Sequence, residues 1–125
     1  MPSSSAYQEQ EMQFAAAAIA KGHQDPGSLR ELLICTTSKT TYPLVNSYFH
    51  QHHHDKELLE ALFLIAMEGE DVGDAPWAAA NTIADFPGLM LREHKAELLE
   101  LSKHEWMYLK VPAQEALNKI AGNAT

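Results

Sequence analysis

Apolar residues recur along this chain at the three- and four-residue spacing of amphipathic helices. In the segment KELLEALFLIAME, one helical face carries Leu58, Leu59, Leu62, Phe63 and Ala66, which is the pattern of a helix that packs against a core. Most windows are filled by Ala, Leu, Glu, Gln, Met and Lys, which favour helices, and β-branched residues are few. We therefore predict an all-α fold. The predicted helices span residues 5–21, 28–37, 42–52, 56–68, 75–86, 93–103 and 111–121.

Residues that commonly begin helices stand at the expected ends. Ser28 and Glu31 have the spacing of a capping box, in which the side chain of each residue accepts a hydrogen bond from the backbone N–H of the other. Asp55 and Asp74 each precede a helical pattern and are predicted to cap it. Pro112 is predicted to lie in the first turn of the last helix, because a missing N–H costs little there.

The helices also form a repeat. When the sequence is shifted by 34 residues, VPAQEALNKI (residues 111–120) aligns with WAAANTIADF (residues 77–86), so that Ala113 meets Ala79 and Leu117 meets Ile83. The preceding helices correspond as well, through LRELL, LLEALFLI and AELLEL. Each unit is a Leu-rich helix, a polar linker, and a helix with small and apolar residues at positions i, i+3, i+4 and i+7.

This pattern resembles the HEAT-type α-helical repeat, best in AELLELSKHEWMYLKVPAQEALNKI and LLEALFLIAMEGEDVGDAPWAAANTIADF. The match of SLRELLICTTSKTTYPLVNSYFHQ is weaker, and the arginine usual in the family's inner helix is missing. The resemblance implies a short right-handed α-solenoid of about three HEAT-like helical hairpins with an N-terminal capping helix, whose units bury their apolar faces by stacking. An irregular helical bundle is the alternative. The expected organisation is a single domain of residues 1–125, with a capping helix and loop at 5–27 and repeats at 28–54, 55–88 and 89–125.

Charge is distributed unevenly along the chain. The net charge is −8, and residues 57–91 contain seven acidic residues and no Lys or Arg. Such a region repels nucleic-acid phosphates and attracts basic surfaces, although a solvated acidic face that maintains solubility has the same pattern. Trp77 lies near a helix end, where an aromatic side chain is either part of the core or an interface anchor. The predicted partner-binding residues are Glu57, Glu60, Glu68, Glu70, Asp71, Asp74 and Trp77.

The stretch HQHHHDKE raises the alternative of a metal site. His50 and His54 are four residues apart and would share a face of a continuous helix, where imidazoles can bind zinc together with Asp55 or Glu57. The predicted helix ends near His52, however, so the two rings should point in different directions. The pair His54-Asp55 is also similar to that of the HD phosphohydrolases, but here it leads directly into an amphipathic helix.

These observations favour a non-catalytic protein-binding module over an enzyme. Its most concrete form is an immunity- or antitoxin-type inhibitor of a basic toxin such as a nuclease, because charge complementarity gives fast capture. The alternatives are a metal-dependent helical enzyme or metal-binding protein that uses the His50–Asp55 cluster, and a scaffold or adaptor subunit. No cofactor, nucleic acid or membrane contact is predicted, and the oligomeric state is left open. The lone Cys35, expected to be inert on an apolar helix face, fits a reducing, cytoplasmic location.

Overall fold

The protein is all-helical, as predicted. The structure, a computed structural model, describes residues 3–68 and 73–122. Within these ranges every regular element is a helix and no strand occurs. None of the described helices combines the length and the apolar character needed to cross a membrane. The chain divides into two compact units, Met1–Gln51 and His52–Thr125, which we call unit 1 and unit 2. The prediction of a single domain stays a prediction.

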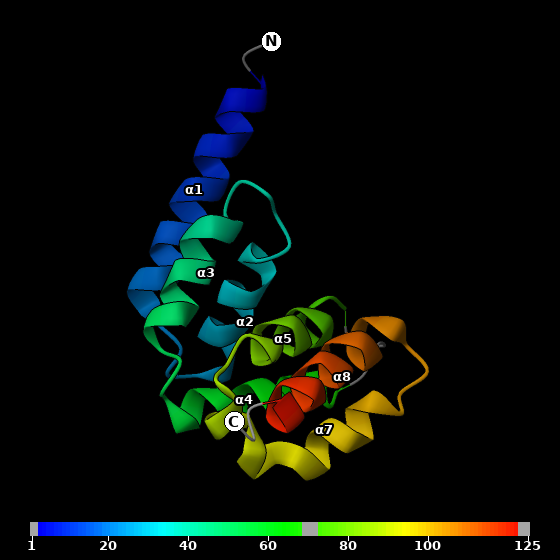
Figure 1. The fold of residues 1–125 in the computed structure, drawn as a ribbon. Helices are drawn as coiled ribbons and strands as arrows, with labels where there is room; N and C mark the ends of the chain where they lie inside the picture. The colour runs from blue at the N-terminus through cyan, green and yellow to red at the C-terminus, as the bar shows by residue number, and fades with distance from the viewer. Residues whose placement is uncertain (1–2, 69–72, 123–125) are drawn as a thin grey trace. The chain divides into compact units, whose positions relative to one another are not determined.

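Unit 1 contains three helices that pack against one another. They are α1 (Ser3–Lys21), α2 (Pro26–Cys35) and α3 (Tyr42–Gln51) (Figure 1). Gly22 ends α1 with a φ of 78°, the left-handed conformation that glycine adopts after helices. An ion pair of 3.2 Å joins Lys21 to Glu31 on α2. The buried side chains of unit 1 include Ala15, Ala18, Leu29, Leu32, Leu33, Val45 and Phe49.

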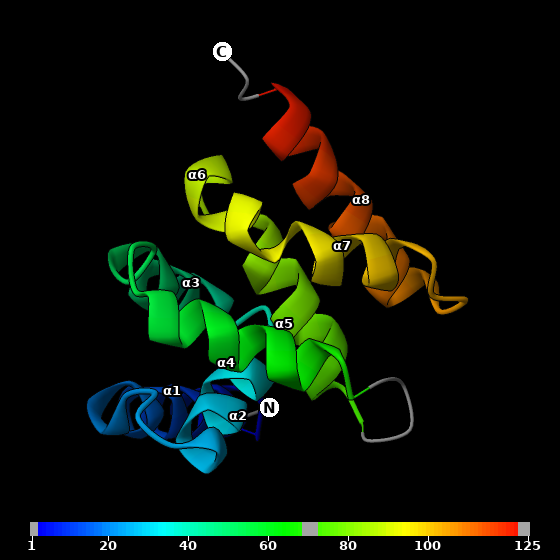
Figure 2. The same cartoon turned by 90° about the horizontal axis from the view of Figure 1, so that it is seen from below.

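Unit 2 contains two helical hairpins joined by short helices. Its elements are α4 (Lys56–Ala66), α5 (Ala75–Ala84), α6 (Gly88–Leu91), the 3₁₀ helix η2 (Arg92–His94), α7 (Lys95–Ser102) and α8 (Met107–Gly122). Helix α4 packs against α5, α7 packs against α8, and α5 lies beside α8 (Figures 1 and 2). Leu62, Ile83, Phe86, Leu98 and Leu109 are fully or almost fully buried in this unit.

Helices α5 and α8 run in the same direction. The Trp77 ring, in the first turn of α5, packs against the Tyr108 ring in the first turn of α8, with centroids 5.6 Å apart. At the other ends, the Lys119 ammonium donates hydrogen bonds to the carbonyl oxygens of Ala84 (2.6 Å) and Phe86 (3.0 Å). Because both contacts join like ends, the two helices are parallel, and small residues such as Ala79, Ala113 and Ala116 are buried along them.

The predicted cap at Ser28 is wrong. Helix α2 begins at Pro26, and Asp25 is its N-cap: the Ser28 backbone N–H donates to Asp25 Oδ1 (2.9 Å) and the Ser28 hydroxyl to Oδ2 (3.0 Å). Pro26 suits the first helical position because its missing N–H has no helical partner there. The two hydrogen bonds from Ser28, backbone first, hold the pKa of Asp25 below its usual value.

The predicted start of the last helix is also wrong. Helix α8 begins at Met107 rather than near residue 111, so Pro112 lies inside the helix. An interior proline removes the hydrogen bond to the carbonyl four residues earlier. The earlier start, however, brings Leu109 into the core, where Pro112 is also buried. In this case, burial of apolar side chains overrides the local preference of proline.

The cap of α4 is confirmed. Asp55 has extended backbone angles, and its Oδ1 accepts a hydrogen bond of 3.0 Å from the Leu58 backbone N–H. Asp74 occupies the same position before α5, but its side chain makes no capping hydrogen bond. The two aspartates therefore form a matched pair with different roles.

Replacing Asp55 with alanine is expected to lower the free energy of unfolding by about 1 kcal/mol, because the N-terminal N–H groups of α4 lose their side-chain acceptor. Urea denaturation followed by circular dichroism measures this change. The control is Asp74→Ala, which removes an aspartate from the equivalent position without removing a capping bond and should cost clearly less. Equal losses for the two variants would show that the Asp55 cap does not stabilise the fold.

Candidate partner-binding surface

The outward side of α4 combines carboxylates with exposed apolar side chains. Glu57, Glu60 and Glu68, three of the predicted partner-binding residues, are all exposed. Leu64 and Met67 lie among them with 73% and 42% of their surfaces exposed. The five positions are separated by helical intervals and so share one side of α4 and the turn that follows it. We call these five residues the acidic α4 surface.

The core fixes which way this surface points. On the other side of α4, the buried side chains are Leu58, Leu59, Leu62, Phe63, Ile65 and Ala66. Burying each large apolar side chain stabilises the fold by about 1.5–3 kcal/mol. Any other rotation of α4 about its axis would expose several of them and lose this free energy. Leu64 was not among the predicted site residues. Its position four residues after Glu60 and seven after Glu57 could have placed it on their face.

A second group of side chains gathers at the first turns of α5 and α8. The rings of Trp106 and Tyr108 meet edge to face with centroids 5.6 Å apart, and Trp77 packs on Tyr108 at the same distance. Tyr108 nevertheless keeps 60% of its surface exposed. The indole N–H of Trp77 donates to Asp74 Oδ1 at 3.2 Å, which holds this carboxylate next to the rings. We call Trp77, Trp106 and Tyr108 the aromatic cluster.

The structure therefore separates the predicted binding residues into two groups. Glu57, Glu60 and Glu68 lie on the acidic α4 surface, whereas Asp74 and Trp77 lie at the start of α5. The predictions for Glu70 and Asp71 fall outside the described residues. Sequence reasoning missed Tyr108 because it placed the start of α8 four residues too late, which left Tyr108 in a loop instead of in a helical turn beside α5.

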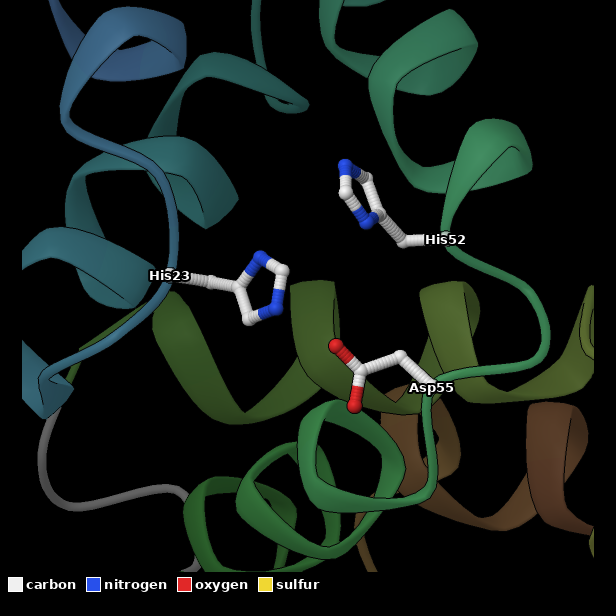
Figure 3. A group of neighbouring side chains, drawn as sticks. All are labelled: His23, His52 and Asp55. Carbon is white, nitrogen blue, oxygen red and sulfur yellow. The ribbon is translucent and has the colours of Figure 1, made fainter.

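The histidine-rich stretch is a turn between two helices. Helix α3 ends at Gln51, residues 52–54 form a turn, and Asp55 caps α4; the side chains of His52 and Asp55 are drawn in Figure 3. His50 and His54 consequently do not share a continuous helix, as expected from the predicted break. Within unit 2, the His53 ring packs on the buried Phe86 ring with centroids 4.8 Å apart. At least one of these histidines therefore has a packing role.

Cys35 is buried at the C-terminal end of α2, as the sequence predicts. Burial raises the pKa of its thiol, and the nearby carboxylates of Glu31 and Glu11 raise it further. The thiol therefore stays protonated at neutral pH, and a protonated thiol is a poor nucleophile. Cys35 borders an open hollow of about 300 Å³ in unit 1, which Phe14 and Ile34 also line.

His94 is held in place by unit 2 from two sides. Its ring stacks on Phe63 of α4 with a centroid distance of 4.4 Å and an angle of 18° between the planes. Its Nδ1 lies 2.8 Å from a carboxylate oxygen of Glu97. An ion pair of 3.6 Å between Lys56 and Glu93 joins the same two segments. These contacts tie η2 to α4, which supports the helix that carries the acidic α4 surface.

Comparisons with models of known protein families, with curated proteins and with solved structures gave no match.

Proposed function

We propose that this chain is a non-catalytic protein-binding module that recognises a basic protein through unit 2. Its most concrete form is an immunity- or antitoxin-type inhibitor of a basic toxin such as a nuclease. The observation that carries the proposal is the acidic α4 surface, where three exposed glutamates surround two exposed apolar side chains.

The charge of the chain is concentrated in the unit that carries this surface. Unit 2 contains 13 acidic and six basic residues, a net charge of −7, whereas unit 1 contains four acidic and three basic residues, a net charge of −1. A field of one sign over one compact unit accelerates association with an oppositely charged protein and disfavours polyanions. This difference supports a basic protein partner and a binding site in unit 2.

The apolar centre of the acidic α4 surface supports a specific contact rather than a general attraction. Interfaces commonly place an apolar anchor at the centre and polar groups at the rim, where the anchor supplies most of the binding energy. Leu64 is more exposed than Met67, and Met67 is a flexible neighbour that adapts to different shapes. Lysine and arginine side chains of a partner can cover such residues with their aliphatic stems while pairing with the glutamates.

We also propose that the helices form a HEAT-like array, which would suit a binding role. The hairpins α4/α5 and α7/α8, and the parallel packing of α5 on α8, are what two successive repeats of this type would produce. In the proposed array α2 and α3 form the first repeat and α1 serves as the cap. Stacked repeats expose extended surfaces that are well suited to protein partners.

The proposal is tested with a partner that co-purifies with the chain from its native cells and is then itself purified. The triple variant Glu57→Lys, Glu60→Lys, Glu68→Lys should raise the dissociation constant for this partner at least about tenfold and slow association. The matched control is Glu9→Lys, Glu100→Lys, Glu115→Lys, which changes the net charge equally at exposed positions elsewhere. If the two triple variants bind equally well, or if the partner is not basic, the proposal is wrong.

A further inference from the structure

We infer that the aromatic cluster and Asp74 form a binding site for an arginine side chain of the partner. Three aromatic rings at a protein surface are unusual because burying them would stabilise the fold, and exposed patches of this kind often mark interaction sites. Tyr108 stands between the two tryptophans and is largely exposed, although it contacts both. The rings come from two places in the chain, the starts of α5 and α8, and are brought together by the parallel packing of these helices.

The carboxylate of Asp74 makes the site negatively charged. Asp74 stands where a capping residue would be expected, yet its side chain makes no capping bond to α5. Instead its Oδ1 accepts a hydrogen bond from the indole N–H of Trp77, so the negative charge lies at the edge of the Trp77 ring. Its second oxygen can accept hydrogen bonds from a bound cation. Glu105, which directly precedes Trp106, is exposed and adds a further negative charge nearby.

This combination of groups fits a guanidinium better than other cations. A guanidinium is planar and weakly hydrated, so it stacks on aromatic rings, and its fork of N–H donors suits a carboxylate. A lysine ammonium can pair with Asp74 but stacks less well because it is compact and strongly hydrated. Lys110 lies two residues after Tyr108 and about 200° around the helix from it, so it points away from the rings.

The inference rests on the proposed function for its partner, but the site can be tested without that partner. Both tryptophans of the chain belong to the cluster, so their fluorescence reports on this site alone. The full chain is titrated with hexa-arginine, hexa-lysine and hexa-citrulline peptides at physiological salt. Hexa-arginine should change the emission and bind about two- to fivefold more tightly than hexa-lysine, and the neutral hexa-citrulline should leave the emission unchanged.

Two variants locate the binding. Asp74→Asn and Tyr108→Leu should each weaken hexa-arginine binding about two- to fivefold. Glu9→Gln is the control, because it removes the same single charge as Asp74→Asn from an exposed position of unit 1 that belongs to neither candidate surface, and it should change the affinity less than about 1.5-fold. Circular dichroism checks that each variant is folded. If Tyr108→Leu does not fold, the result for Asp74→Asn alone tests the site.

The inference is overturned if arginine and lysine peptides bind equally, or if Glu9→Gln weakens binding as much as Asp74→Asn. Its failure is distinguishable from failure of the proposed function. If the peptide results are as expected but the triple lysine variant of α4 retains its partner, the aromatic site stands and the acidic α4 surface is not the interface. If the peptides do not bind as expected while that triple variant loses its partner, the acidic α4 surface is the interface and the aromatic site is not supported.

Discussion

Replacing Phe86 with alanine is expected to lower the free energy of unfolding by about 3–5 kcal/mol. Phe86 is 0% exposed, its ring packs on that of His53, and its backbone carbonyl accepts a hydrogen bond from Lys119. Truncation removes the transfer energy of the ring and leaves a cavity that the surrounding helices fill only in part. Because domains of this size are commonly stable by only about 5–15 kcal/mol, the variant should unfold at a much lower urea concentration.

The control for this substitution lies three residues away. Leu89 is 73% exposed, so Leu89→Ala removes a large apolar side chain without opening a cavity. Its effect on the free energy of unfolding should stay within about 0.5 kcal/mol. Both variants can be measured by urea denaturation of the full chain. Losses of similar size would mean that Phe86 does not occupy the core of unit 2.

The second large effect is expected at Lys119. Its ammonium donates to two carbonyls at the C-terminal end of α5, where a positive charge also interacts favourably with the helix dipole. Lys119→Met retains most of the aliphatic stem but removes both hydrogen bonds and leaves two half-buried carbonyls without their donor. We expect a loss of about 1.5–3 kcal/mol in the free energy of unfolding.

Lys110→Met is the matched control, since Lys110 is an exposed lysine on the same helix. Thermal unfolding of the two variants, at the same protein concentration and salt, separates the role of the contact from the loss of one charge. The Lys119 variant should melt at a clearly lower temperature than the Lys110 variant. If the two variants melt together, the contact between α8 and the end of α5 contributes nothing to stability.

Sequence patterns predicted the helices better than their ends. The stripe on α4 was readable because its apolar residues repeat over three turns, and Asp55 was readable because a capping aspartate acts within four residues of the chain. Ser28 was wrongly predicted as a cap because two helix-start signals overlap. The Asp25-Pro26 pair, one turn before the Ser28–Glu31 pair, is the one at which α2 begins. The start of α8 depended on the burial of Leu109, which is a property of the packed unit and not of the local sequence.

The acidic α4 surface could be predicted in part from the sequence, whereas the aromatic cluster could not. Exposed glutamates on α4 followed from the charge pattern together with the helical period, and the same period could have placed Leu64, which was not predicted, on their face. The aromatic cluster could not be derived in this way, because Trp77 and Tyr108 are distant in sequence and meet only through the parallel packing of α5 and α8. The repeat had placed these helices in equivalent positions, but a repeat pattern does not say which ring contacts which.

The fastening of α5 to α8 at both ends bears on the kinetics of recognition. With rings joined at one end and Lys119 bonded at the other, the two helices are restrained from sliding past each other. A partner that binds the first turns would then meet side chains that are already in position, and little conformational entropy would be lost on binding. Loosening the far end by Lys119→Met should therefore shorten the lifetime of a complex formed at the aromatic cluster, although no contact with the partner is removed.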